Sequence, residues 1–109
     1  MVIYEVNLEI SPEVANDYKI WLQKHILQML EINGFSSYKL FAEKSQIIDS
    51  GSNNEDKTCK LVVHYEIDSK ESLDEYLANQ AKSMRGDIPK EFFGKFKAWR
   101  RVLMPEDQS

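Results

Sequence analysis

The sequence is poor in cysteine and has no long hydrophobic run. Cys59 is its one cysteine, so no disulfide can form within the chain and nothing indicates an oxidising compartment. The apolar runs are only a few residues long, too short to cross a bilayer as a helix. The residues that follow Met1 also lack the basic and apolar stretches of a secretory signal. We therefore expect a cytoplasmic protein that has no contact with a membrane.

Motifs that identify a reaction or a cofactor are also missing. The sequence has no His/Cys cluster at zinc-binding spacing, no glycine-rich phosphate loop, no dinucleotide fingerprint and no serine elbow. Residues 58–67 lack the aromatic and glycine pattern of an RNA-binding sheet. We therefore expect no metal and no cofactor, and the sequence alone leaves open whether the protein is an enzyme.

The charge balance disfavours nucleic acid as a partner. The net charge is −4, whereas nucleic-acid-binding domains are usually basic. The charge is unevenly distributed, because residues 82–101 hold seven basic and two acidic residues and carry +5, so that the rest carries −9. Anion binding by this basic segment stays open, but we expect no nucleic-acid partner.

Length and patterning predict one domain of four strands and two helices. The 109 residues are enough for one core, and we expect the domain to cover 1–104, followed by a polar tail over 105–109. Alternating apolar residues predict strands over 2–10, 58–67 and 96–104, and another begins at Phe35 and runs to about residue 42, with a possible extension through Ile47-Ile48.

The first predicted helix begins at Ser11-Pro12, with Ser11 as its cap, and ends near Ile32, before Asn33-Gly34. The second begins with Asp68 as its cap and runs to Gly86, with Leu77 and Gln80 on its buried side. We expect Phe92 and Phe93 to anchor the connector that follows.

The order strand, helix, strand, strand, helix, strand predicts a ferredoxin-like α+β sandwich. Two β-α-β units with right-handed crossovers form a four-stranded antiparallel sheet with both helices on one face and the first and third strands at its centre. The other face is open and carries Glu5, Asn7 and His64. The last strand adds either Trp99 and Arg101 or Arg100 and Val102 to this face, since its register is not fixed by the sequence. We expect a second copy of the chain to cover it, forming a homodimer.

Several short segments resemble a family of short bacterial proteins known only as a domain of unknown function. The resemblance covers residues 2–103 and implies a dimeric α/β barrel, in which two ferredoxin-like subunits press their sheets together, without implying a reaction. Leu27 and His64 depart from the family pattern, which weakens any family-wide role for His64. The segments that carry the resemblance are Ile3-Tyr4-Glu5-Val6, Trp21 with His25-Ile26, Gly34-Phe35, Leu73 with Tyr76-Leu77, Phe93-Gly94-Lys95-Phe96 and Arg100-Arg101-Val102-Leu103.

Two histidines are the candidate catalytic residues. His25 lies on the apolar side of the first helix, one turn after Trp21, where it is either a proton carrier at the edge of a pocket or a buried histidine with a structural hydrogen bond. His64 shares a face with Glu5 and Asn7, so it is either a general base beside a carboxylate or part of an ordinary polar sheet face.

The candidate ligand-binding residues are Arg100 and Arg101, together with Glu5, Asn7, Trp21 and Trp99. A guanidinium group can hold a carboxylate or a phosphate through two hydrogen bonds. The alternative is a salt bridge to Glu5, to Glu66 or to a partner subunit. Successive residues of a strand point to opposite faces, so one arginine at most can face a given cleft.

Two functions of different classes remain. The first is a small dimeric binding or accessory module in the cytoplasm, which the missing catalytic motifs favour. The second is a cofactor-independent small-molecule enzyme resembling the monooxygenases and isomerases of dimeric barrels, an analogy at the level of the fold. In that case His25 or His64 moves a proton, Asn7 orients the substrate and Arg101 holds an anionic group.

Overall fold

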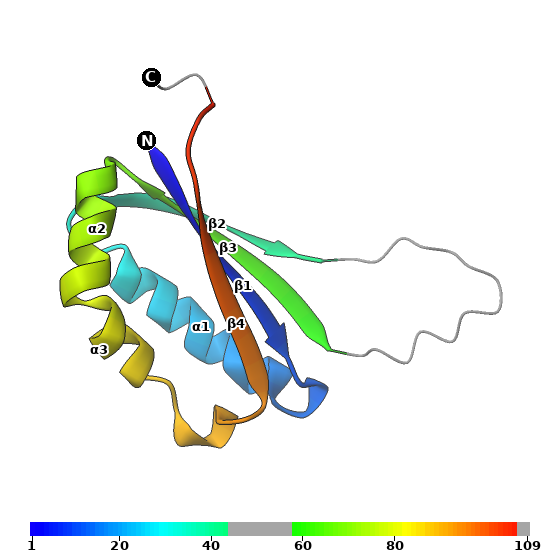
Figure 1. The fold of residues 1–109 in the computed structure, drawn as a ribbon. Helices are drawn as coiled ribbons and strands as arrows, with labels where there is room; N and C mark the ends of the chain where they lie inside the picture. The colour runs from blue at the N-terminus through cyan, green and yellow to red at the C-terminus, as the bar shows by residue number, and fades with distance from the viewer. Residues whose placement is uncertain (44–57, 107–109) are drawn as a thin grey trace, which may run out of the picture.

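The protein folds as a four-stranded sheet covered on one face by helices (Figure 1). The computed structural model describes residues 1–43 and 58–106; Ile47-Ile48 and residues 107–109 of the predicted tail lie outside the described residues. In chain order the elements are β1 (Val2–Ile10), η1 (Pro12–Val14), α1 (Ala15–Met29), β2 (Phe35–Ala42), β3 (Cys59–Ile67), α2 (Lys70–Asn79), α3 (Ala81–Gly86), η2 (Lys90–Phe92) and β4 (Phe96–Leu103).

The strand order is β2-β3-β1-β4, with every neighbouring pair antiparallel. The first and third strands are therefore central, and the helices α1, α2 and α3 all lie on one side (Figure 1). The predicted ferredoxin-like α+β fold is confirmed.

One face of the sheet and the inner sides of the helices make the hydrophobic core. The alternate residues of β1 and β3, from Val2 to Ile10 and from Leu61 to Ile67, are buried against the helices, as the period of two predicts. From α1 the core takes Tyr18, Leu22, Ile26 and Met29, and from α2 it takes Leu73 and Tyr76.

The first helix differs from the prediction at both ends. It begins with the 3₁₀ turn η1, and the Ser11 side chain makes no capping hydrogen bond; Pro12 at the first helical position supplies the start instead. The regular helix ends at Met29 rather than near Ile32, and the chain reverses at Gly34, whose φ is +94°. A Cβ on Gly34 would lie 2.5 Å from the Cβ of Ser72, so α2 can approach this turn only because residue 34 is glycine.

The second predicted helix is interrupted. Its cap is Ser69, whose hydroxyl accepts a hydrogen bond from the Ser72 amide, and not Asp68. The helix breaks at Gln80 into α2 and α3, so Gln80 and Leu77 are exposed rather than buried. In the connector, Phe92 is buried but Phe93 is 61% exposed, so Phe92 alone anchors it.

None of the described helices is long and apolar enough to span a membrane.

The pairing of β4 with β1 decides which arginine faces which side. Arg101 pairs with Glu5 and Trp99 pairs with Asn7, so these residues share the open face of the sheet. Arg100 pairs with Val6 and therefore faces the helices.

Candidate functional site

The structure divides the predicted site residues between the two faces of the sheet. Trp21, His25 and Arg100 line a cavity between the helices and the sheet. Glu5, Asn7, His64, Trp99 and Arg101 lie on the open face. The predicted residues therefore do not form one site.

The cavity is small, with largely aromatic walls. It encloses about 40 Å³ and widens to about 470 Å³ when its solvent-facing part is included. Its lining comes from α1, α2, α3 and from strands β1, β3 and β4. Met84 and Arg85 of α3 belong to the lining. The inner part admits a few water molecules, so a ligand with an aromatic ring must also occupy the part of the cavity that is open to solvent.

His25 contributes an unsatisfied nitrogen to this cavity. Its ring stacks on Trp21, with ring centroids 4.8 Å apart and planes 17° from parallel. Its Nδ1 is buried and has no hydrogen-bond partner in the part of the chain that the structure describes. Burial lowers the pKa of His25; the charge of Arg100 lowers it further, while Asp87 raises it. The imidazole is therefore neutral at pH 7 and can accept or donate a hydrogen bond.

Four tyrosines surround the same space. Tyr4, Tyr18, Tyr65 and Tyr76 all line the cavity. Burial raises the pKa of Tyr18 and of Tyr76 to about 12, and it also raises the pKa of Tyr65, with further contributions from Tyr76 and Tyr4. These three phenols are protonated at neutral pH, so their hydroxyl groups can donate hydrogen bonds.

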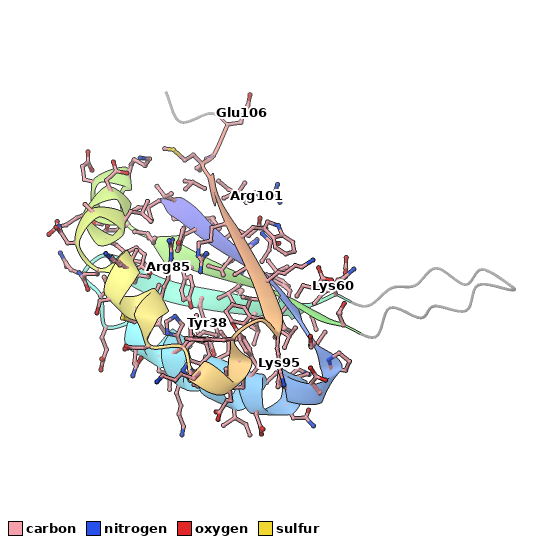
Figure 2. The ribbon with its side chains drawn as sticks, turned by 60° about the horizontal axis from the view of Figure 1, so that its bottom comes forward. Tyr38, Lys60, Arg85, Lys95, Arg101 and Glu106 are labelled. Carbon is pink, nitrogen blue, oxygen red and sulfur yellow. The ribbon has the colours of Figure 1, made fainter. Side chains whose placement is uncertain are left out.

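Two arginines add positive charge to the cavity. Arg100 reaches it from β4, and Arg85 reaches it from α3, where its Nη2 donates to the Tyr4 hydroxyl over 3.2 Å. Arg85 lies between α3 and the strands, on the opposite side of β4 from Arg101 (Figure 2). Neither Arg85 nor the tyrosines were predicted from the sequence as site residues. The unused signal was the number of tyrosines in the buried rows, since buried tyrosine hydroxyls need partners.

The open face carries a network of hydrogen bonds around Glu5. The Glu5 carboxylate accepts from His64 Nε2 at 2.9 Å, from Asn7 Nδ2 at 3.3 Å and from the Arg101 guanidinium, which also forms an ion pair with it. These partners leave Glu5 only 5% exposed. The hydrogen bond from Arg101 lowers the pKa of Glu5 to about 2, and the bonds from His64 and Asn7 act in the same direction against desolvation.

Apolar residues adjoin this network. Trp99 is 50% exposed and Phe41 is 46% exposed. With Val62 they line an open groove of about 380 Å³.

Within the described residues, no group of three or more His, Cys, Asp or Glu side chains is arranged to hold a metal ion.

Solved structures of three proteins show how widespread this fold is. The Arabidopsis thaliana protein At3g17210 has a TM-score of 0.69 at 17% identity, covering 100% of this chain and 99% of that one. SnoaB, a cofactor-independent oxygenase from Streptomyces nogalater, has a TM-score of 0.60 at 9% identity, covering 96% and 93%. A dimeric ferredoxin-like protein from an uncultured marine organism has a TM-score of 0.61 at 13% identity, covering 96% of both chains. At these identities the similarity shows a shared fold.

No curated protein matches the sequence. A family model, described as a domain of unknown function (DUF4286), matches residues 1–105. The match spans all the described strands and helices. The chain therefore belongs to the DUF4286 family.

Proposed function

We propose that the protein is a homodimeric module that binds a small molecule in the cavity between its helices and its sheet. The observation that carries this proposal is that His25, which lines the cavity, has a buried Nδ1 without a hydrogen-bond partner among the described residues. A buried polar atom without a hydrogen bond costs about 1–3 kcal/mol. A ligand that supplies the missing hydrogen bond recovers this free energy on binding.

The composition of the walls supports the same function. Small-molecule sites combine apolar and aromatic walls with a few polar groups that orient the ligand. Here Trp21 and the tyrosines provide the walls, while His25 and Arg100 provide polar groups. Met84 has a flexible side chain, so the cavity can widen at α3 without disturbing the sheet.

The open face supports a homodimer. Exposed Trp99 and Phe41 beside a neutralised carboxylate make a surface that a second sheet can cover. A structural neighbour is described as a dimeric ferredoxin-like protein.

The expectation of a cytoplasmic location rests on the lone cysteine and remains part of this proposal.

Binding is tested by titrating the intact protein with indole while amide chemical shifts are followed by NMR. We expect saturable shifts in α1 and β4 around His25 and Arg100. Ala98→Leu fills the cavity from β4 and should abolish them, whereas Ala78→Leu, at an exposed position of α2, should not. If Ala98→Leu fails to fold, Ala98→Val provides a smaller filling change. Shifts confined to the open face, or unaffected by filling the cavity, contradict the proposal.

The homodimer is tested separately by sedimentation velocity at micromolar concentration. We expect the mass of two chains for the wild type and of one chain for Trp99→Glu, since a charge replaces an exposed ring at the sheet face. Leu27→Glu is the matched control, because Leu27 is 61% exposed on α1, away from the sheet. A monomeric wild type would contradict the dimer.

A second candidate function is cofactor-independent proton transfer by His25. The lowered pKa of His25 favours it, because a neutral imidazole in an apolar cavity can accept a proton at neutral pH. The test is solvent deuterium exchange of 2-indanone, an aromatic ketone with acidic C–H bonds. We expect acceleration that His25→Gln reduces by about 100-fold and that His64→Gln leaves unchanged. Binding of 2-indanone without faster exchange would contradict the enzyme and leave the binding module.

A further inference from the structure

Among the described residues, some basic side chains are paired with a carboxylate, and the two arginines at the cavity are among those that are not. Arg101, Lys70 and Lys95 each have a carboxylate within salt-bridge distance. Among the described residues, neither Arg85 nor Arg100 has one. Asp87, just after α3, is near enough to act on His25 but pairs with neither arginine. The cavity therefore has positive charge on its wall without a matching negative group.

The rings of three tyrosines lie close together at the same place, and the Tyr76 hydroxyl donates to Met29 Sδ at 3.6 Å. The ring of Tyr4 lies 6.3 Å from that of Tyr65 and 5.9 Å from that of Tyr76, measured between centroids. Because the Tyr4 oxygen accepts from Arg85, the proton of that hydroxyl remains available to a further acceptor. Burial raises the pKa of Tyr76, and the charges of Arg85 and Arg100 both act against this rise, so both arginines are near enough to affect its hydroxyl.

We propose that the ligand of the cavity is an aromatic carboxylate or a similar organic anion, with its negative group held by Arg85, Arg100 and the Tyr4 hydroxyl. This inference rests on the binding function proposed above. Guanidinium and phenol groups both donate hydrogen bonds, and charge-assisted hydrogen bonds to a carboxylate are stronger than neutral ones. The ring of the ligand then lies against Trp21, Tyr18 and Phe96, which are in contact through Tyr18. Because His25 is neutral, the positive charge that attracts the anion comes from the two arginines.

The test compares benzoate with benzamide, which has the same ring and nearly the same shape but no charge. Dissociation constants are measured by NMR titration of the intact protein. We expect benzoate to bind the wild type about tenfold more tightly than benzamide, with shifts around Tyr4, Tyr76 and Arg100.

Substitutions test whether the arginines cause the preference for benzoate over benzamide. Arg100→Gln should weaken benzoate binding by about tenfold and change benzamide binding less than about twofold, while Arg100→Lys should retain part of the preference. Lys97→Gln removes the same charge from an exposed position on the other face of β4 and should leave both affinities unchanged.

The outcomes separate the two proposals. Equal binding of both compounds at the cavity contradicts the anionic ligand and leaves the binding function intact. A preference for benzoate that Lys97→Gln reduces as much as Arg100→Gln also contradicts it, because the effect is then one of net charge. Absence of cavity shifts with benzoate, benzamide and indole alike contradicts the binding function itself, and the anion inference with it.

Discussion

Arg100 and Arg101 are neighbours in sequence but belong to two different electrostatic environments. Arg101 lies on the open face, paired with Glu5 in a network that also includes Asn7 and His64. Arg100 lies on the helix side and lines a cavity where no described carboxylate pairs with it. The open face is thus polar but satisfied within the chain, whereas the cavity has an unpaired cation and an unpaired histidine nitrogen.

This difference suggests a structural role for the open face and a ligand-binding role for the cavity. Charges that neutralise one another cost less to bury under a second sheet than unpaired charges do, which suits an interface between subunits. Hydrogen-bond donors and cations without partners beside a cavity favour the binding of a ligand, because the ligand can supply the partners that the fold does not. The cavity is therefore the stronger candidate for binding, although the sequence pattern pointed equally to both histidines.

The largest expected effect contrasts Val63 with Val62 of β3. Val63 is fully buried under the helices, while Val62 is partly buried on the open face. We expect Val63→Ala to lower the free energy of unfolding by about 2–3 kcal/mol, from lost burial and a new cavity. Val62→Ala should cost less than about 1 kcal/mol at low protein concentration. Urea unfolding at several concentrations measures both, and equal costs at high dilution would contradict the assignment of faces.

The next effect is the pH dependence that Glu5 produces. Its pKa in the folded protein is about 2, below its ordinary value, so the carboxylate stabilises the fold above the unfolded pKa of 4.5. This stability is lost as the pH falls from about 4.5 toward 2. Because the Arg101 side chain is 65% exposed, solvent reduces the contribution to roughly 1 kcal/mol.

Glu5→Gln should flatten this part of the stability curve, whereas Glu9→Gln, on the same face of β1, should not. Urea unfolding between pH 2 and pH 6 provides the measurement. A wild-type curve that is already flat in this interval would show that the network around Glu5 does not stabilise the ionised carboxylate.

A smaller effect sharpens the contrast between the two arginines. Arg101→Gln should destabilise the fold slightly, because solvent screens this exposed ion pair, and should raise the pKa of Glu5 toward its ordinary value. Arg100→Gln should leave the stability nearly unchanged, within about 0.5 kcal/mol, but should raise the pKa of His25, because the charge of Arg100 lowers it. Carboxyl and imidazole NMR titrations distinguish the two variants. If Arg101→Gln instead changed the pKa of His25 and Arg100→Gln changed that of Glu5, the two arginines would lie on the opposite faces of β4 from those described.

The last contrast concerns His25→Leu, which should also change the stability little. Because Nδ1 has no hydrogen bond in the described structure, an apolar side chain of similar size should alter the free energy of unfolding by less than about 1 kcal/mol. The lowered pKa of His25 also means that its wild-type contribution falls as the pH drops below 6.5, and the variant should lack this loss. A destabilisation of more than about 2 kcal/mol would indicate a structural partner for the ring.

Local patterns predicted most of the fold. The period of two in β1 and β3 identified the buried rows, and the order of the elements identified the topology, because both depend on residues close in sequence. The pairing of Glu5 with His64 followed from the same rows. The break at Gln80 escaped prediction, because the apolar period continues through it to Ala81 and Met84 while the backbone changes direction.

The sequence by itself determined the four strands, the two crossovers and which sides of the central strands are buried. The tertiary structure alone decided which arginine enters the cavity, because β4 has apolar residues in both phases of its alternation and takes its register from hydrogen bonds to β1. It also decided that tyrosines from four elements, β1, α1, β3 and α2, meet around one space. Such a convergence depends on contacts between residues far apart in the chain, which no local pattern specifies.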